Sequence, residues 1–277
     1  VDVQRAGPST GMPTKTEQSD LNHAMFGGHG EAPRVVIAPA NVRDCFDWTV
    51  EAFNIAEEYQ VPVILLSDMA LSSRMEGIEP VDPSKLRIKS RKLAGPGALQ
   101  NYERYAFTPS GVSPMAVPGI RGGEHSARGI EHDPRGVPSY EPAMHREMTA
   151  KRFRKLDTLA KTLPPPPRYG HPEPKVGVIG WGSTEGAIRE AINWSEAKGY
   201  KVAALHPRVL NPLPEQAIAE FLKPLKRIIV PELNYTGQFA QIIRARFGVD
   251  VLRVNVCEGR PFKVREIFSA IEEAYRT

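Results

Sequence analysis

Hydrophobic residues near the start of the chain follow a strand–helix–strand pattern. Short continuous apolar runs, typical of buried strands, lie at 34–38 (RVVIA) and 61–68 (VPVILLSD). The intervening segment 41–60 repeats apolar residues every three or four positions, which predicts an amphipathic helix. Asn41 is a suitable N-cap, and Asp44 is favourable in the first turn. Because buried strands joined by a helix pair in parallel, this stretch predicts a β–α–β unit.

The same alternation returns in the last hundred residues. Short apolar runs predict strands, and amphipathic stretches between them predict helices, so a second doubly wound unit with a parallel sheet is expected. The final helix carries its apolar residues on one face, and Gly199 is placed to end an earlier helix. The predicted strands are 175–180, 200–205, 226–232 and 250–255, and the helices are 183–199, 213–224, 237–248 and 264–275.

The middle of the chain lacks the regular hydrophobic periodicity of the regions on either side. Proline and glycine become frequent, and one helix is expected at 142–163 before a proline run that is typical of a semi-rigid spacer. The predicted fold class is therefore α/β, with two doubly wound parallel-sheet domains joined by a long Pro/Gly-rich connector. The expected boundaries are 1–80 for the first domain, 81–172 for the connector and 173–277 for the second domain.

Composition narrows the class of protein. With 41% hydrophobic and 25% charged residues, the 277-residue chain is typical of a globular protein. The net charge of +4 is dispersed, which argues against nucleic acid as a partner, and no apolar run is long enough to predict a membrane span. Two cysteines favour a reduced, cytoplasmic setting and cannot by themselves hold an iron–sulfur cluster. The chain opens on VDV, which reads as a strand already inside a domain, so we expect a fragment of a longer protein.

One glycine-rich turn invites a nucleotide-binding interpretation. Gly180 and Gly182 follow a predicted strand and precede a helix, as a dinucleotide fingerprint requires. The third glycine is Gly186, one position later than the fingerprint needs. The next strand ends in 206–208 (HPR), where an acidic residue should meet the ribose. These two departures favour a tight structural turn over NAD binding.

A small group of histidines and acids in the connector could in principle gather a metal. His125 and His132 lie among Glu124, Glu131 and Asp133, but neither an HExxH motif nor paired cysteines support a site. Solvated loop histidines are the better interpretation, and we predict no metal ligation by this chain.

The segment from Arg5 to Asp20 is rich in hydroxyls, glycine and proline. Its prolines forbid a regular helix or inner strand, so the backbone amides of Ser9, Thr10 and Thr14 lack ladder partners. Arg5 could bind a carboxylate through two parallel hydrogen bonds, with nearby hydroxyls completing a cradle. A polar surface loop with Arg5 in a structural ion pair explains the same residues, and the residues alone leave both interpretations open.

A family resemblance favours the cradle. The opening VDVQRAGPSTGMPTKTEQSDL, followed by GGHGE and VVIAP, closely resembles the α subunit of 2-oxoacid:ferredoxin oxidoreductases, especially the 2-oxoglutarate type. The likeness continues through YERYAFTPSGVSPMAVPG and GIEHDPRG. It ends in a region similar to a transketolase C-terminal domain, from VGVIGWGS to VPELNYTGQFAQIIR. It therefore covers essentially the whole chain, and it implies that the first domain is part of the pyrimidine-side domain of a thiamine-diphosphate enzyme.

The resemblance implies an activity and a division of labour. The expected reaction is oxidative decarboxylation of 2-oxoglutarate to succinyl-CoA, with coenzyme A as co-substrate and electrons passed to ferredoxin. Arg5 would hold the substrate carboxylate with Thr14 beside it, and Ser9 and Thr10 belong to the same predicted substrate-binding segment. Thiamine diphosphate and Mg²⁺ would be shared with a β subunit that also carries a [4Fe-4S] cluster, in a dimer of αβ units. Ala6 stands where the family often has glycine, a change expected to be tolerated.

Two alternatives remain beside this expectation. The same chemistry could act on pyruvate or a branched-chain 2-oxoacid, because part of the discriminating pocket belongs to the β subunit. A non-catalytic assembly subunit, whose second domain only mediates contacts, is the alternative from another class.

Overall fold

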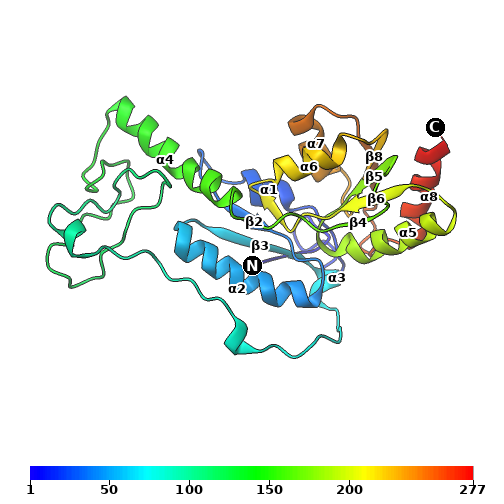
Figure 1. Cartoon of the computed structure of the whole chain (residues 1–277), viewed down its shortest axis with the longest axis horizontal. Coiled ribbons are helices and arrows are strands. Elements are labelled where there is room, and N and C mark those ends of the chain that lie inside the picture. The colour runs from blue at the N-terminus through cyan, green and yellow to red at the C-terminus, as the bar shows by residue number, and fades with distance from the viewer. Residues whose placement is uncertain (277) are drawn as a thin grey trace.

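The computed structural model describes residues 1–276 and shows two twisted sheets packed side by side (Figure 1). In the described residues, the first sheet has four strands in the order β1-β3-β2-β7, and the second has five in the order β4-β6-β5-β8-β9. Helices lie on the faces of both sheets, as strand–helix alternation requires. The predicted α/β class with two parallel-sheet units is confirmed.

The first sheet is built around the predicted β–α–β unit. Its members are β2 (Val35–Ile37), α2 (Val42–Tyr59) and β3 (Val63–Asp68), and the two strands pair in parallel. The Asn41 side chain accepts the amide of Asp44 at 2.8 Å, so the predicted N-cap is confirmed. Strand β1 (Asp2–Gln4) lies parallel to β3, as the opening VDV suggested.

The second sheet follows the predicted alternation in its parallel part. Strands β5, β6, β8 and β9 run in parallel, and the left-handed Gly199, at φ +76°, follows the end of α5. Its elements are β5 (Val176–Ile179), α5 (Glu185–Ala197), β6 (Val202–Leu205), α6 (Glu215–Leu222), β8 (Arg227–Glu232), α7 (Gln238–Phe247), β9 (Leu252–Asn255) and α8 (Val264–Arg276), with the 3₁₀ turn η3 (Gly182–Thr184) before α5.

Two antiparallel strands depart from the purely parallel prediction. Strand β4 (Arg168–Gly170), at the end of the proline run, closes one edge of the second sheet against β6. Strand β7 (Val209–Asn211) leaves the second unit and pairs with β2 of the first. Both strands have only three residues, too few for a periodicity to predict them. Because β7 completes the first sheet, the two units are joined by backbone hydrogen bonds as well as by side chains.

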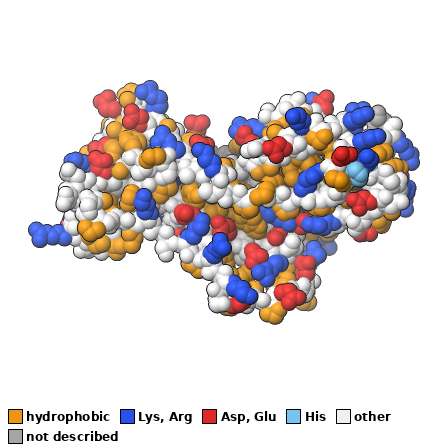
Figure 2. All heavy atoms as spheres, in the orientation of Figure 1, with side chains coloured by type: hydrophobic (Ala, Val, Ile, Leu, Met, Phe, Trp, Pro, Cys, Tyr) orange, Lys and Arg blue, Asp and Glu red, His pale blue; other side chains and the backbone are white. Residues whose placement is uncertain are grey.

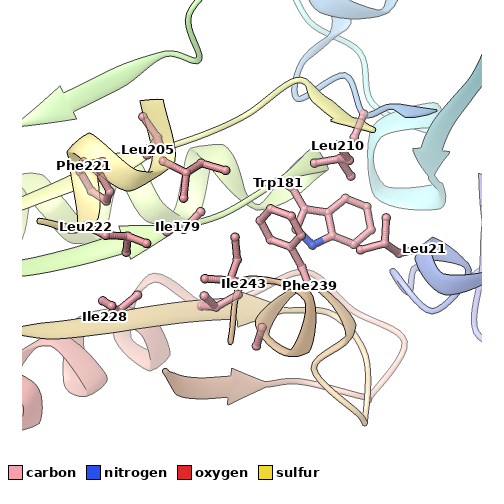
Figure 3. Close-up of a cluster of buried hydrophobic side chains, with 14 of the residues drawn as sticks. Leu21, Ile179, Trp181, Leu205, Leu210, Phe221, Leu222, Ile228, Phe239 and Ile243 are labelled. Atoms are coloured by element: carbon pink, nitrogen blue, oxygen red, sulfur yellow. The ribbon is translucent and has the colours of Figure 1, made fainter. Parts of the chain in front are cut away.

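The apolar core is continuous across the two units. Trp181, which is fully buried after β5, packs edge-on against Phe239 of α7 and joins a cluster that includes residues of both sheets (Figure 3). Leu21 contributes to this cluster from the short helix α1 (Leu21–Phe26). A second cluster fills the opposite face of the second sheet beneath α5 and α8. Burial of this size makes the relative placement of the two units part of the fold.

The connector is mostly irregular and contains the expected helix. Helix α4 (Pro142–Ala160) starts at the predicted proline and ends three residues earlier than predicted. Leu156 and Leu159 pack it against α2 and the first sheet. Figure 1 shows α4 running from the outlying loops back toward the sheets. The other short elements are α3 (Met69–Ser72), η1 (Pro83–Lys85) and η2 (Pro96–Leu99).

Charged side chains of both signs are interspersed over the face shown in Figure 2, in keeping with the dispersed charge of the sequence. Among the described residues, every helix is too short or too polar to cross a membrane.

Candidate functional site

Residues 5–15, here called the Arg5 loop, follow the carboxyl end of β1. Because Gln4 pairs with Asp68, the loop also lies at the carboxyl end of β3. The carboxyl ends of parallel strands are where ligands bind in open α/β sheets. Most residues of the loop are exposed, and Arg5 itself is partly exposed. The loop is therefore accessible in the position that this fold class uses for binding.

Backbone contacts close the Arg5 loop on itself. The Ala6 amide donates to the Lys15 carbonyl at 2.9 Å, and the Met12 amide donates to the Ala6 carbonyl at 2.9 Å. Gly11 has a φ of +45°, and a Cβ at this position would lie 2.1 Å from the Ala6 oxygen. Only glycine fits such a close approach in a left-handed conformation, so this residue is required by the shape of the loop.

The guanidinium of Arg5 turns inward onto its own loop. Nη2 donates to the Ser9 carbonyl at 2.7 Å, and Nη1 donates to the Thr10 carbonyl at 2.6 Å. These two bonds fix the plane of the group and leave three of its five N–H donors available. The alternative interpretation requires Arg5 to form a structural ion pair. Within residues 1–276, no carboxylate forms an ion pair with Arg5. The charge is therefore held in place, and no ion pair among the described residues neutralises it.

The other predicted site residues share this loop with Arg5. Ser9 and Thr10 meet the guanidinium through their carbonyls and not through their hydroxyls. Thr14 is exposed, and no hydrogen bond joins it to Arg5 in the part of the chain that the structure describes. In that same part, the amides of Ser9, Thr10, Gly11 and Thr14 form no backbone hydrogen bond. The loop thus combines a fixed cation with several free donors, a combination that suits an anion.

The segment after the loop, 16–20, connects the two sheets. The Thr16 hydroxyl donates to Asp68 at 3.1 Å, which ties the segment to the end of β3. Gln18 then reaches the second sheet, because its side-chain amide donates to the Trp181 carbonyl at 3.0 Å and its oxygen accepts the Leu233 amide at 3.1 Å. The base of the Arg5 loop is therefore held at the carboxyl ends of strands in both sheets.

Glu232, at the end of β8, is a buried acid that the sequence interpretation missed. Its carboxylate accepts the backbone amides of Phe239 and Ala240 at 2.8 and 3.0 Å, as well as the side chains of Trp181 and Asn234. Burial raises its pKa, and these four donors oppose that rise. Asn234 in turn donates to the Gln18 carbonyl at 2.9 Å. An acid that ends an otherwise apolar strand just before a glycine-started helix was the available signal.

We expect the substitution Glu232→Gln to weaken the contacts between the two units beneath the Arg5 loop and so to lower the free energy of unfolding. The glutamine side chain would place an N–H donor against the N–H groups that the Glu232 carboxylate now accepts. Leaving such buried donors unpaired costs about 1–3 kcal/mol. Urea denaturation measures the loss, with Glu258→Gln, an exposed carboxylate, as the control. Equal stability of the two variants would contradict the assigned role.

The second unit contacts both the Arg5 loop and the segment 16–20 that follows it. The Cys257 thiol donates to Glu17 at 3.2 Å, and Glu17 is 7% exposed. At Gly259, whose φ is +66°, a side chain would lie 2.7 Å from the end of Met12 and 2.8 Å from Lys15. The loop is therefore confined on one side by the second unit.

The glycine turn after β5 is filled by the protein itself. A Cβ at Gly182 would lie 2.7 Å from the Gln18 amide nitrogen, and the Gly182 carbonyl meets Nε2 of His206 at 3.1 Å. Gln18 and the buried His206 thus occupy the space that a dinucleotide phosphate would need. Through Gln18, this turn also connects the two units.

Metal ligands do not gather among the described residues. No group of three or more histidine, cysteine, aspartate or glutamate side chains in residues 1–276 is arranged to hold a metal ion. Instead, Glu131 pairs with Arg152 at 3.2 Å and also with His145. These side chains do not fit a magnesium–diphosphate site or a cluster site.

Comparison with known proteins places this geometry in a family. The profile described as pyruvate flavodoxin/ferredoxin oxidoreductase, thiamine diphosphate-binding, matches residues 1–151, and that of pyruvate:ferredoxin oxidoreductase core domain II matches residues 175–267. The chain is 40% identical over 277 residues to the 2-oxoglutarate oxidoreductase subunit KorA of Mycobacterium tuberculosis, with 99% of this chain and 42% of that protein covered. It is 30% identical over 251 residues to the 2-oxoglutarate synthase subunit KorA of Methanothermobacter marburgensis, covering 90% of this chain and 66% of that protein.

A solved structure agrees with both domains. The 2-oxoglutarate:ferredoxin oxidoreductase of Magnetococcus marinus, solved with 2-oxoglutarate, coenzyme A and succinyl-CoA bound, superposes with a TM-score of 0.93. The identity is 40%, and the match covers 99% of this chain and 48% of that chain. The chain thus spans less than half the length of several relatives it matches. Its fold, its order of elements and the profile that matches more than half of its length show that it belongs to the pyruvate flavodoxin/ferredoxin oxidoreductase family.

Proposed function

We propose that this chain is part of the α subunit of a thiamine-diphosphate-dependent 2-oxoacid:ferredoxin oxidoreductase that acts on 2-oxoglutarate. The names of the relatives support the reaction class, and both KorA relatives and the Magnetococcus marinus enzyme support the substrate. Both matched domains cover the chain in the order expected for such a subunit.

The fixed, unneutralised guanidinium of Arg5 carries the proposal. Two hydrogen bonds to its own loop hold the group in one orientation, and its remaining donors can bind a carboxylate. Because the loop already holds the guanidinium in position, little conformational entropy of Arg5 is lost when substrate binds. More of the binding energy is then available to orient the 2-oxoacid. Ser9, Thr10 and Thr14 then supply hydroxyls and free amides on the same loop.

In the proposed reaction, the bond between the carboxylate and the keto carbon breaks and carbon dioxide leaves. The acyl group passes to the sulfur of coenzyme A, the thiol proton is released, and two electrons reduce two ferredoxins. Thiamine diphosphate, when bound, would supply the electron sink for this decarboxylation. The task of this chain is to hold the substrate carboxylate at Arg5 and to fix the Arg5 loop against both sheets through Thr16 and Gln18.

The proposal includes partners and a compartment. The magnesium–diphosphate site and the [4Fe-4S] cluster are assigned to a β subunit, ferredoxin is the electron acceptor, and the assembly is a dimer of αβ units. The subunit descriptions of the relatives support the need for a partner. Free Cys45 and Cys257 support a reducing, cytoplasmic location.

A substrate panel tests the proposed activity. The full-length α subunit, assembled with its β partner, should reduce a viologen dye in the presence of coenzyme A, fastest with 2-oxoglutarate. Pyruvate and 2-oxoisovalerate are the comparison substrates. A preference for either of these would reassign the substrate. No turnover with any of the three, despite bound thiamine diphosphate and an intact cluster, would favour the assembly-subunit alternative.

We expect Gly11→Ala to impair substrate use while leaving the fold intact. The new Cβ would meet the Ala6 oxygen, so the loop and the Arg5 guanidinium must shift. A displacement of this kind lowers kcat/KM by roughly 10- to 100-fold. Gly119→Ala is a matched control, since Gly119 also has a positive φ (+89°) but has open space around its Cβ position. Steady-state kinetics with equal losses in both variants would contradict the explanation.

A further inference from the structure

A second concave site lies at the other end of the first sheet. A cavity of about 460 Å³ is bounded by the last turn of α2, the residues that lead into β3, helix α4 and the connector around Arg104. Pro62 lines it just before β3 begins, whereas the Arg5 loop lies where β3 ends. A six-residue strand spans about 20 Å, so the two sites are separated by the length of the sheet. We call this site the Lys151 cavity.

The charged groups that line the Lys151 cavity are all cations. Arg91 is neutralised by Glu57, with bonds of 3.0 and 3.1 Å. Arg104, Lys151 and Lys155 also line the cavity, and none of the three has a carboxylate partner among residues 1–276. Lys151 and Lys155 lie one turn apart on α4, where like charges repel. The cavity therefore holds three uncompensated positive charges.

Lys151 is the least satisfied of these groups. It is 6% exposed, and in the described part of the chain its ammonium takes part in no hydrogen bond or ion pair. Burial, reinforced by repulsion from Lys155, Arg104 and Arg152, lowers the pKa of Lys151 to about 8. Burying an unpaired cation is costly, and a ligand that supplies negative charge would remove that cost.

A single residue organises the cluster. Gln60 ends α2 in a left-handed conformation, and its backbone carbonyl accepts Nζ of Lys155 at 2.9 Å. Its side-chain oxygen accepts Arg104 at 2.9 Å, and its side-chain nitrogen donates to the Ser113 carbonyl at 2.8 Å. Arg104 also lies over the ring of Tyr105, 5.3 Å from its centre. Arg104 and Lys155 are thus held at the cavity by neutral acceptors, which position them without cancelling their charge.

We propose that the Lys151 cavity binds a small polyanion of the diphosphate class. Its volume lies in the range of small-molecule sites, and three unpaired cations match a ligand with two or more negative charges. Arginine supplies planar donors and lysine a mobile ammonium, the pair that proteins use for phosphate groups. An acidic segment of a protein partner is less well suited, because Lys151, the cation without a hydrogen bond or ion pair in the described residues, is only 6% exposed and is reached more readily by a small ligand.

Calorimetric titration with inorganic diphosphate tests the proposal on the assembled full-length enzyme. Saturation with thiamine diphosphate beforehand blocks the cofactor site. We expect a dissociation constant below about 1 mM and a loss of at least about tenfold in affinity in Lys151→Met. Lys161→Met removes one charge from the exposed end of the same helix and should bind as the parent does.

Three further measurements keep the result interpretable. Lys151→Met should unfold at the same or a higher temperature than the parent without ligand, because an unpaired buried cation has been removed. If that variant fails to fold, Arg104→Gln should show the same loss of diphosphate affinity. The KM for the 2-oxoacid should stay unchanged in both variants, so this site and the Arg5 loop are tested separately.

Three results would overturn the proposal. One is equal diphosphate affinity in Lys151→Met and the parent, which would place binding elsewhere. The second is an absence of diphosphate binding by the parent. The third is a structure of the assembled enzyme with a carboxylate of a partner subunit in the cavity, which would identify the site as a subunit contact.

Discussion

Arg5→Ala in the assembled enzyme should raise the KM for 2-oxoglutarate strongly and lower kcat/KM by roughly 30- to 5,000-fold. That range corresponds to the loss of a charge-assisted pair with the substrate carboxylate, which costs about 2–5 kcal/mol. Stability should hardly change, because the guanidinium bonds only to carbonyls of an exposed loop. Viologen reduction at varied 2-oxoglutarate concentration measures the first effect, and thermal unfolding measures the second.

Two controls make the Arg5 result specific. Arg128→Ala removes an exposed arginine from the connector and should leave KM unchanged. Arg5→Lys keeps the charge but cannot bond both loop carbonyls while presenting two parallel donors, so it should recover only part of the activity. A lower unfolding temperature with unaltered kinetics in Arg5→Ala would return Arg5 to a purely structural role.

Arg208→Met should be the most destabilising single substitution at the interface between the two units. The guanidinium of Arg208 is 7% exposed and bonds Asp44 of α2, Glu185 of α5 at 2.8 Å and the His206 carbonyl at 3.0 Å. Removing it leaves Asp44 without an ion-pair partner among the described residues and leaves the buried Glu185 with only the half-exposed Arg189. Breaking a buried ion pair in this way costs about 3–5 kcal/mol, which urea denaturation at pH 7 would detect.

The loss of stability caused by Arg208→Met should become smaller as the pH is lowered. Burial tends to raise the pKa of Glu185, but attraction from His206 and Arg208 outweighs it and holds the pKa below its ordinary value. In the parent, this stabilisation is present above the unfolded pKa and disappears as the pH falls through the folded one. Without Arg208, burial instead favours protonation of this carboxyl, so the difference in stability between parent and variant should shrink as the pH falls through and below the ordinary pKa of glutamate.

Arg189 offers the matched control for this prediction. It pairs with the same Glu185 at 3.2 Å, but its side chain is 52% exposed. Arg189→Met should therefore cost no more than about 1 kcal/mol. Suppose that Arg208→Met lowers the free energy of unfolding as little as Arg189→Met does, or that its effect does not depend on pH. Then the ion pairs of Arg208 do not stabilise the interface between the two units.

The local pattern was sufficient for the long elements. Helix α2 has an apolar stripe and an N-cap within one stretch of sequence, and β3 and β8 are continuous apolar runs, so each could be predicted without its neighbours. The short strand β7 had no such signal, because three residues cannot establish a period. Its pairing with β2 depends on the placement of a segment more than 170 residues away in sequence.

The Arg5 loop shows the same division. Its prolines and glycines excluded regular structure, and the family resemblance predicted its purpose, but only the fold shows Arg5 bonded to the Ser9 and Thr10 carbonyls. Gln18 carried no local signal strong enough to single it out, because its partners Trp181 and Leu233 follow strands more than 160 residues away in sequence.

The sequence by itself determined the α/β class, most of the long helices and strands, the family and the segment that holds Arg5, the cation proposed to bind the substrate. These depend on periodicity, on the backbone limits of proline and glycine, and on motifs, all of which are local. The tertiary structure decided how the units share a sheet and a core and which buried acids and arginine join them. It also decided that four lysine and arginine side chains line one cavity, of which only Arg91 has a carboxylate partner among the described residues. Such features arise from desolvation and from contacts between distant segments, and both exist only once the chain is folded.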